Sequence, residues 1–447
     1  MLIFSGVEIM NIILLSGGSG KRLWPLSNDI RSKQFIKLFK TENGSYESMV
    51  QRVYRQIISV DPNASVTIAT SETQVSAIKN QLGEKADICV EPCRRDTFPA
   101  IALAAAYLHY AMKKPLDESV AVCPVDPYVE NTYYEAVKKL CELASEGSAN
   151  LTLMGIEPTY PSEKYGYIIP KTADNVSVVM EFKEKPDTET ARKYIAKGAL
   201  WNAGVFAFKL GYLIEKAHEL IDFTDYDDLF SKYETLTKIS FDYAVVEKEK
   251  SINVMRYSGD WRDVGTWNMM TEVMSDNVKG KAVLDDKCEN TQVVNELGIP
   301  VLCMGCKNMI VAASSDGILV SDKERSGYMK PYVEDIANDV MYAEKSWGTY
   351  TVIDVQNGSM TVKIGLKKGS SMKYHSHEFR NEVWTVVSGS GRVVIGGEER
   401  FVSSGAVVEI PIGAKHTISA DTDMNIIEVQ IGESISEKDK QIYCEGN

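Results

Sequence analysis

Short apolar runs alternate with amphipathic stretches from residue 11 to about residue 270. The runs have the length of buried strands, while stretches such as 72–81, 99–112 and 131–145 carry apolar residues at helical spacing. This alternation predicts βαβ units around a mostly parallel sheet, and hence an α/β domain over residues 10–270. The predicted strands are NIILLS, SVTIAT, DICVE, SVAVCPVD and NLTLMGI.

The pattern changes after this domain. Over residues 275–340, brief β-type runs are separated by polar turns, which predicts a small β-rich linker domain. Over residues 345–440, apolar runs such as TYTVIDV, MTVKIGL and GRVVIGG recur at about ten-residue spacing with glycine-bearing turns. Even spacing of this kind predicts a small antiparallel barrel or jelly roll.

Length and charge narrow the class of protein. With 447 residues, of which 44% are hydrophobic, the chain is expected to form a multidomain globular protein. The 49 basic and 62 acidic residues give a net charge of −13 without runs of either sign, which argues against nucleic acid polymers and membranes as partners. No apolar stretch approaches the roughly 20 residues that span a bilayer, and the N-terminus lacks a secretion signal. We therefore expect a soluble, cytoplasmic protein that concentrates positive charge where it binds phosphate.

A glycine-rich loop, GGSGKRLWPLS, follows the first predicted strand directly. Its glycines allow backbone N–H groups to approach an anion, and its cations add positive charge. A Walker A loop would need Ser or Thr after the Gly-Lys pair, where Arg22 stands, and a dinucleotide loop would need a third glycine. The loop is therefore predicted to cradle a triphosphate. The nucleotide-binding residues predicted in it are Gly17, Gly18, Ser19, Gly20 and Lys21.

This loop and the segment after it resemble the signature of the bacterial mannose-1-phosphate guanylyltransferase family. GGSGKRLWPLS followed by SKQF is similar to the family pattern GGxGxRLWPLSR…PKQF, with Ser32 at the family's proline. The resemblance implies a Rossmann-like nucleotidyltransferase domain in which Arg22 and Lys33 grip the phosphates of nucleotide and sugar. It also implies that GTP and mannose 1-phosphate give GDP-mannose and pyrophosphate by in-line attack on the α-phosphorus.

A second stretch, EPCRRDTFPAI, resembles the family's EPxxRNTAPAI, with an aspartate at the family's asparagine. The resemblance implies that this segment lines the nucleotide site, where a capped helix N-terminus exposes N–H groups. The residues concerned are Glu91, Arg95, Asp96 and Thr97.

Two aspartates are predicted to hold a metal ion. Asp126 ends the run SVAVCPVD, and ligands of open α/β sheets bind outside the carboxyl ends of strands. Asp263 lies in WRDVGTW, which resembles the family's WxDVGSW. Two carboxylates suit Mg²⁺ held against nucleotide phosphates.

Segments between these aspartates resemble the family's GIxPT, YGYI, EKP and WNxG, and by resemblance they form the sugar pocket. Aromatic and glycine residues allow stacking and close backbone contact, while carboxylate and amide groups can bond sugar hydroxyls. The predicted sugar-binding residues are Tyr165, Gly166, Glu184, Lys185, Asn202 and Gly204, and Asp242 also matches a family position.

The C-terminal barrel carries a candidate transition-metal site. The spacing His375-x-His377-x4-Glu382, followed by His416, fits the two cupin motifs. Residues i and i+2 of a strand share a face, so these side chains are expected to point into the barrel together. Three imidazoles and one carboxylate suit Zn²⁺, Fe²⁺, Mn²⁺ or Ni²⁺ without choosing among them.

The barrel also resembles the phosphomannose isomerase tail found in this family, with two departures. The isomerase has Gln where His375 stands, and its EDDIVR segment reads EKDKQI here, without the arginine expected near the substrate. Of the Lewis acid, base and phosphate-binding cation that isomerisation needs, only the first is evident. Isomerase activity therefore stays open beside another sugar reaction or a structural barrel.

Two other interpretations of the whole chain also stay open. One is a nucleotidyltransferase for another NTP or a heptose phosphate, since nothing in the sequence marks the base-reading residues. The other is a sugar-nucleotide-binding sensor, against which the intact Arg22, Lys33, Asp126 and Asp263 argue. We expect the protein to be a homo-oligomer, most simply a dimer.

Overall fold

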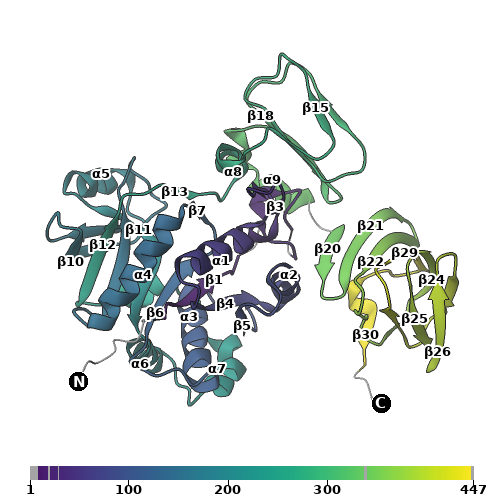
Figure 1. Ribbon diagram of the computed structural model, residues 1–447, viewed down its shortest axis with the longest axis horizontal. Coiled ribbons are helices and arrows are strands. Elements are labelled where there is room, and N and C mark those ends of the chain that lie inside the picture. Colours follow the sequence, from purple (N-terminus) through teal and green to yellow (C-terminus); the bar gives the residue numbers. More distant parts are fainter. Residues whose placement is uncertain (1–8, 19–20, 29, 337–339, 444–447) are drawn as a thin grey trace. The chain divides into compact units, whose positions relative to one another are not determined.

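The computed structural model describes residues 9–18, 21–28, 30–336 and 340–443 (Figure 1). The contacts within the chain form two compact units. The first unit comprises the residues up to Gly18, Gln34–Gly265 and Glu272–Ser275. The second comprises Ser19–Lys33, Thr266–Thr271 and the chain from Asp276 onward. The glycine-rich loop is thus divided: Gly17 and Gly18 group with the first unit, as does the strand before them, and the rest of the loop groups with the second.

A nine-stranded sheet organises the first unit, in the order β5-β4-β1-β6-β11-β8-β12-β10-β9. Neighbours β5, β4, β1 and β6 are mutually parallel, as are β8 and β12, whereas β11 runs antiparallel to both β6 and β8. The strands are β1 (Asn11–Leu15), β4 (Ser65–Ser71), β5 (Asp87–Glu91), β6 (Ser119–Pro124), β8 (Leu151–Ile156), β9 (Tyr167–Pro170), β10 (Val176–Lys183), β11 (Leu200–Lys209) and β12 (Ile252–Tyr257).

The sheet is mixed, which corrects the extent of the parallel arrangement predicted from the sequence. All five runs predicted as strands form β1, β4, β5, β6 and β8, and these strands share one direction. β9, β10 and β11 pair with their neighbours in antiparallel ladders, and none of them was predicted as a strand. β9 and β11 contain parts of the predicted sugar-pocket segments, whereas β10 contains none. Antiparallel strands need no crossover helix, so the βαβ alternation carries no sign of them.

Helices flank this sheet, and the predicted amphipathic stretches all contain them. Helix α3 (Thr97–Ala106) is apolar on all sides and buried from Phe98 to Ala106, as expected of a helix inside a core. Helix α1 begins after Ser48, whose side chain accepts from the Gln51 N–H in a capping box. The other helices of four or more residues in this unit are α2 (Glu72–Leu82), α4 (Asn131–Glu146), α5 (Thr188–Ala196), α6 (Leu210–Leu220), α7 (Tyr226–Lys232) and two π-helical turns (Tyr107–Ala111 and Asp242–Val246), and α1 spans Met49–Val60.

The linker part of the second unit is built from very short strands. β14, β16 and β18 are parallel and β19 closes this sheet in antiparallel direction, while β15 and β17 form a separate parallel pair. Successive strands therefore alternate between two sheets, which lets parallel strands follow each other without helices. The elements are β14 (Val278–Lys279), β15 (Ala282–Leu284), β16 (Gln292–Asn295), β17 (Val301–Cys303), β18 (Met309–Ser314), β19 (Gly317–Asp322), α8 (Trp267–Val273) and α9 (Lys330–Ile336).

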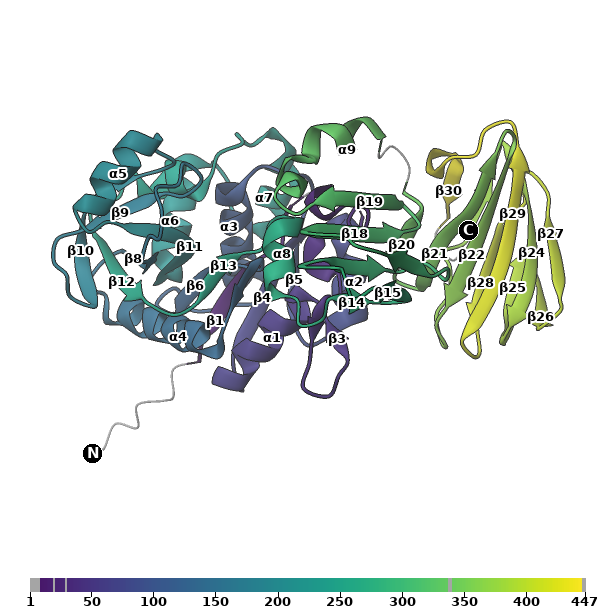
Figure 2. The ribbon, with the colours of Figure 1, turned by 90° about the horizontal axis from the view of Figure 1, so that it is seen from above.

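Two antiparallel sheets face each other in the C-terminal part, which confirms the predicted jelly-roll barrel (Figure 2). Trp384, Ile364 and Ile418 are buried between them. One sheet contains β20 (Tyr342–Lys345), β21 (Gly348–Gln356), β22 (Ser359–Leu366), β29 (Met424–Gly432), β24 (Arg380–Ser388) and β27 (Val407–Ile410). The other contains β26 (Glu398–Ser403), β25 (Ser390–Ile395), β28 (His416–Ala420), β23 (His375–His377) and β30 (Lys440–Ile442). Among the described residues, no helix combines the length and apolar character needed to cross a bilayer.

Candidate active sites

The two predicted metal-binding aspartates meet at one end of a two-stranded ribbon. β7 (Pro127–Val129) pairs with β13 (Trp261–Asp263), and Asp263 lies opposite Pro127, next to Asp126. Burial raises the pKa of the Tyr165 phenol, and the negative charges of Asp263 and Asp126 raise it further, so both carboxylates lie near this ring. Two carboxylates in the same neighbourhood are a donor set that fits Mg²⁺.

A cluster of acidic side chains lies in the predicted sugar-binding region. A Cβ on Gly166 would come 2.5 Å from Oε2 of Glu184, so only glycine allows the carboxylate its present place. Oε1 of Glu184 is 2.7 Å from Nζ of Lys185, whereas buried Oε2 has no hydrogen-bond partner in the described residues. A buried acceptor of this kind is costly unless a ligand hydroxyl completes it.

Asp242 extends this acidic cluster, although in the sequence it was noted only as a match to a family position. Nδ2 of Asn202 donates to Oδ1 of Asp242 at 2.7 Å, and the Asn202 N–H donates to the Gly166 carbonyl at 2.8 Å. Burial raises the pKa of Asp242 to about 6, and the charge of Glu184 adds to the shift. Gly204, at φ +69°, donates its N–H to Oδ1 of Asn202 at 3.1 Å. These contacts fix the direction of the Asn202 amide.

Aromatic rings form a wall beside the aspartates. The Tyr165 ring centroid is 4.9 Å from that of Trp201 and 5.5 Å from that of Trp261. The indole Nε1 atoms of both tryptophans are buried and lack hydrogen-bond partners in the described residues. Flat apolar faces with unused donors suit a sugar ring. Both tryptophans lie within the family motifs found in the sequence, but neither was predicted as a site residue.

The predicted nucleotide-binding residues of the first unit are held by local hydrogen bonds. A Cβ on Gly17 would lie 3.7 Å from Oε1 of Glu91, which places this buried carboxylate against the start of the loop. Oε2 of Glu91 accepts from the Tyr233 hydroxyl at 2.8 Å, and burial raises the pKa of Glu91. Nε2 of Gln74 donates to the Gly18 carbonyl at 3.3 Å, which holds the start of the glycine-rich loop.

The segment before α3 caps the helix as its sequence suggests. Asp96, at φ +71°, accepts the Thr97 N–H at 2.8 Å, and the Thr97 hydroxyl accepts the Phe241 N–H at 2.8 Å. Arg95 donates to the Glu234 carbonyl. A non-glycine residue at positive φ stores backbone strain, which is common at ligand sites.

The predicted cations of the loop lie in the second unit. Lys21 and Arg22 form a single 3-10 turn (Lys21–Leu23), and Lys33 begins the next one (Lys33–Phe35). Arg22 is exposed and Lys21 and Lys33 are half-buried. Ser19 and Gly20, which the sequence predicts to contact phosphate, lie outside the described residues.

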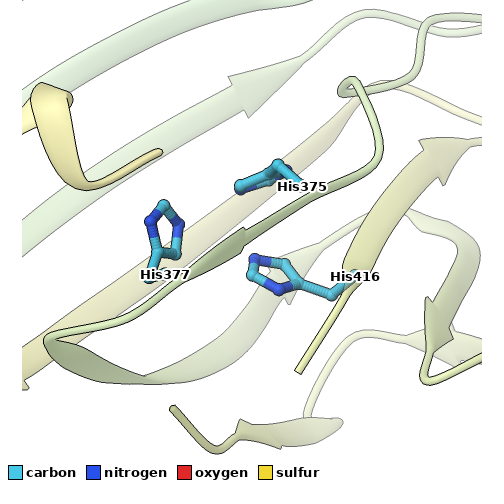
Figure 3. Close-up of side chains that lie close together, drawn as sticks. All are labelled: His375, His377 and His416. Atoms are coloured by element: carbon cyan, nitrogen blue, oxygen red, sulfur yellow. The ribbon is translucent and has the colours of Figure 1, made fainter. Parts of the chain in front are cut away.

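Three imidazoles meet inside the barrel, as the cupin spacing predicts. His375, His377 and His416 are buried, and one ring nitrogen of each lies within 4.8 Å of the others (Figure 3). Nδ1 of His375 faces the Lys373 carbonyl at 2.7 Å, and Nδ1 of His416 faces the Ala414 carbonyl at 2.8 Å. Because carbonyls only accept, both Nδ1 atoms carry the proton and both Nε2 atoms keep a lone pair for a metal.

Glu382, the predicted fourth ligand, lies beside two of these imidazoles. Its oxygens lie 3.0 Å from Nε2 of His377 and 3.3 Å from Nε2 of His416, and the latter nitrogen has no hydrogen-bond partner in the described residues. A lone pair that faces a carboxylate is unfavourable unless a cation lies between them. Burial lowers the pKa of His375 to about 3, with the charge of Lys440 contributing, so the imidazole stays neutral as a ligand must. These residues therefore fit a transition metal.

The barrel also brings charged groups to the histidines that the sequence did not place there. Lys440 of β30 lies opposite His377 of β23, and its charge acts on both His375 and Glu428. Burial, together with the charge of Glu382, raises the pKa of Glu428 to about 8, and Gln430 donates to its carboxylate. A cation and a carboxyl group able to hold a proton thus accompany the imidazoles, where the sequence showed only metal ligands. The alternation of apolar and polar residues along IEVQ could have indicated this, because Glu428 and Gln430 lie on the same face of their strand.

Fold and site together define a nucleotidyltransferase joined to a cupin barrel, and comparisons with known proteins agree. The nucleotidyl transferase family profile matches residues 11–280, and the profile of the mannose-6-phosphate isomerase C-terminal domain matches residues 335–443. A xanthan biosynthesis protein of Xanthomonas campestris pv. campestris is 31% identical over 465 residues, which cover 96% of each chain. A mannose-1-phosphate guanylyltransferase of Escherichia coli K12 is 30% identical over 470 residues, again with 96% of each chain covered.

Among solved structures, the chain is similar to a mannose-1-phosphate geranyltransferase of Thermus thermophilus. The TM-score is 0.61 at 28% identity, and the match covers 73% of this chain and 99% of that one. The chain therefore belongs to the mannose-1-phosphate guanylyltransferase family of nucleotidyltransferases.

Proposed function

We propose that this enzyme transfers GMP from GTP to mannose 1-phosphate and releases pyrophosphate. The observation that carries the proposal is that Asp126 and Asp263 both lie beside Tyr165, where a donor set suited to Mg²⁺ would adjoin aromatic rings suited to a sugar. The substrates follow those named for the relatives of this chain. We further propose that the enzyme acts in the cytoplasm as a homodimer, for which sedimentation at several concentrations is the test.

The proposed reaction needs positioning and charge stabilisation, and no protein nucleophile. Asp126 and Asp263 would hold Mg²⁺, which when bound neutralises charge on the nucleotide phosphates. Glu184 and Asn202 would hold the sugar hydroxyls, so that a phosphate oxygen of mannose 1-phosphate approaches the α-phosphorus in line. The new bond joins this oxygen to the α-phosphorus, the bond to the bridging oxygen breaks, and pyrophosphate leaves. The loop cations, above all Arg22, would stabilise the charge that develops on the phosphates.

Pyrophosphate release by the purified protein with Mg²⁺ tests this proposal. GTP, ATP, CTP and UTP are each combined with mannose, glucose and heptose 1-phosphates. We expect the highest kcat/KM for GTP with mannose 1-phosphate. Preference for another pair would keep the chemistry but replace the substrates, and no release from any pair would favour a sugar-nucleotide sensor.

For the barrel we propose a second activity, the interconversion of mannose 6-phosphate and fructose 6-phosphate. The supporting observation is that Lys440 and Glu428 accompany the three imidazoles, since isomerisation needs a phosphate-binding cation and a proton-transfer group beside a Lewis acid. The metal would be a divalent transition ion, with Zn²⁺, Fe²⁺, Mn²⁺ and Ni²⁺ as the candidates.

A coupled assay of fructose 6-phosphate formation tests the second activity. Lys440→Gln should raise KM for the sugar phosphate, because it removes the cation beside the imidazoles. Lys438→Gln is the matched control, since Lys438 is exposed two residues earlier on the same segment. Equal effects of both substitutions would remove Lys440 from the site, and absence of isomerisation in the metal-loaded wild type would leave a structural barrel.

A further inference from the structure

Buried polar contacts attach the glycine-rich loop to the linker domain. The Arg31 guanidinium donates to both carboxylate oxygens of Glu296, at 2.6 and 3.0 Å. Arg31 is only 9% exposed, and Glu296 directly follows β16 of the linker. A two-pronged, largely buried pair of this kind fixes both distance and orientation. The loop therefore has one preferred placement on the linker.

Asn28 links the same loop to two other elements at once. Its Oδ1 accepts the N–H groups of Ile30 and Arg31, at 2.9 and 2.7 Å, which shapes the turn before Arg31. Its Nδ2 donates to Oδ2 of Asp316 at 2.7 Å and to the Tyr342 carbonyl at 3.0 Å. Asn28 thus uses both ends of its amide, and no other side chain of its size offers two donors and an acceptor in this arrangement.

The loop is also held at its middle. Nε1 of Trp267 donates to the Trp24 carbonyl at 2.9 Å, and Oγ of Ser314 donates to the Pro25 carbonyl at 2.6 Å. Gly317, at φ +147°, lies directly against the Trp24 indole, where a Cβ would overlap the ring. The linker surface therefore matches the shape of the loop as well as its polar groups.

The first strand of the cupin barrel contributes to the same attachment. Besides accepting from Asn28, Tyr342 places its ring 5.2 Å from the Arg31 guanidinium carbon, a cation–π distance. Tyr342 belongs to β20, which pairs with β21 of the barrel. Elements of both the linker and the barrel thus meet on one short stretch of the loop.

We infer that Arg31, Asn28 and Glu296 form a clamp that positions the phosphate-binding loop, so that the linker domain takes part in nucleotide binding. The inference rests on the proposed function, in which Arg22 and Lys33 of this loop contact phosphates. Arg31 and Glu296 are positioning residues, because they act through the loop. A loop held at Trp24, Asn28 and Arg31 keeps its cations in place before the nucleotide arrives, which reduces the entropy lost on binding.

Glu296→Gln tests the clamp, because it keeps the side-chain shape but removes the charge that Arg31 binds. We expect KM for the nucleotide to rise about tenfold to a hundredfold, as displaced binding groups do, while KM for the sugar phosphate stays within about twofold. Glu289→Gln is the matched control: Glu289 lies in the same domain and its ion pair with Lys307, at 2.8 Å, is exposed on both sides. A purely structural role would instead lower the active fraction, and hence kcat, with both KM values unchanged.

A second measurement tests the clamp without any activity. Arg31 and the next residue, Ser32, are buried, so trypsin cleaves the bond between them only when this segment leaves its place. The initial cleavage rate at this bond therefore reports the clamp. We expect the rate to rise at least about tenfold in Glu296→Gln and to stay at the wild-type value in Glu289→Gln. Unchanged cleavage in Glu296→Gln would overturn the clamp, whatever the substrates of the enzyme. Faster cleavage with no nucleotide turnover in the wild type would instead overturn the proposed function and leave the clamp standing.

Discussion

Replacement of Gly166 by alanine gives the sharpest test of the proposed sugar pocket. The new Cβ would lie 2.5 Å from Oε2 of Glu184, 3.1 Å from Cζ of Phe182 and 3.3 Å from Cβ of Asn202. Non-bonded heavy atoms pack at about 3.5 Å or more, so the carboxylate must withdraw by about 1 Å. It cannot withdraw freely, because Glu184 is buried and its other oxygen is paired with Lys185.

The expected magnitude follows from this displacement. A hydrogen bond from a ligand hydroxyl to a carboxylate contributes about 1.5–3 kcal/mol, which corresponds to a factor of roughly 10 to 150 in kcat/KM. Misplacement of a positioning group by 1 Å costs about a hundredfold, which lies in the same range. We therefore expect kcat/KM for mannose 1-phosphate to fall about thirtyfold or more, with KM for GTP nearly unchanged. Overpacking should also lower the free energy of unfolding by about 1–3 kcal/mol.

Initial rates of pyrophosphate release, with one substrate saturating and the other varied, measure both constants, and thermal unfolding measures stability. Gly298→Ala is the control, since a Cβ there meets no atom within 4 Å and its φ is not in the left-handed region. A double-mutant cycle with Glu184→Ala isolates the contact, because Gly166→Ala should cost little once the carboxylate is gone. If Gly166→Ala lowers kcat/KM equally in both backgrounds, or affects GTP as much as the sugar phosphate, the assignment of this pocket is wrong.

Three further predictions concern the metals and the buried acid. Asp263→Asn should lower turnover about a hundredfold or more, because it weakens the carboxylate pair. The control, Asp260→Asn, loses only an exposed ion pair with Arg262 and should keep the wild-type rate. Equal turnover of the two variants would reject the magnesium assignment. His416→Ala should abolish the transition metal measured by elemental analysis, whereas His218→Ala, outside the barrel, should retain it, and retained metal in His416→Ala would show that other ligands hold it. The folded-state pKa of Asp242, about 6 against an ordinary 3.8, means that the folded protein binds the extra proton between these values. This group therefore makes the free energy of unfolding fall as pH rises from about 4 to 6 and then level off. In urea unfolding, Asp242→Asn should flatten this dependence of stability on pH. An unchanged dependence would contradict the raised pKa of Asp242.

Much of the fold followed from local patterns. The βαβ alternation predicted five strands correctly, because a strand buried on both faces needs a continuous apolar run. Even spacing of short apolar runs and glycine turns predicted the barrel, because successive antiparallel strands are joined by short turns. The antiparallel strands β9, β10 and β11 were not predicted as such, since strand pairing depends on residues far apart in the chain and leaves no local periodicity.

The residues of the candidate sites also fall into those that the sequence could place together and those that it could not. Donors close in sequence, such as His375 and His377, could be assigned to one face because the strand period decides it. Groups that act together from separate elements, such as Glu428 with Lys440, or Arg31 with Glu296, meet only when sheets close and loops pack. The sequence by itself determined the chemistry: which side chains can bind phosphate, sugar or metal, and in which family pattern they occur. Only the tertiary structure decided which of them are neighbours, which carboxylates are buried enough to have shifted pKa values, and which domain holds the phosphate loop, because burial and proximity between distant segments are properties of the packed chain.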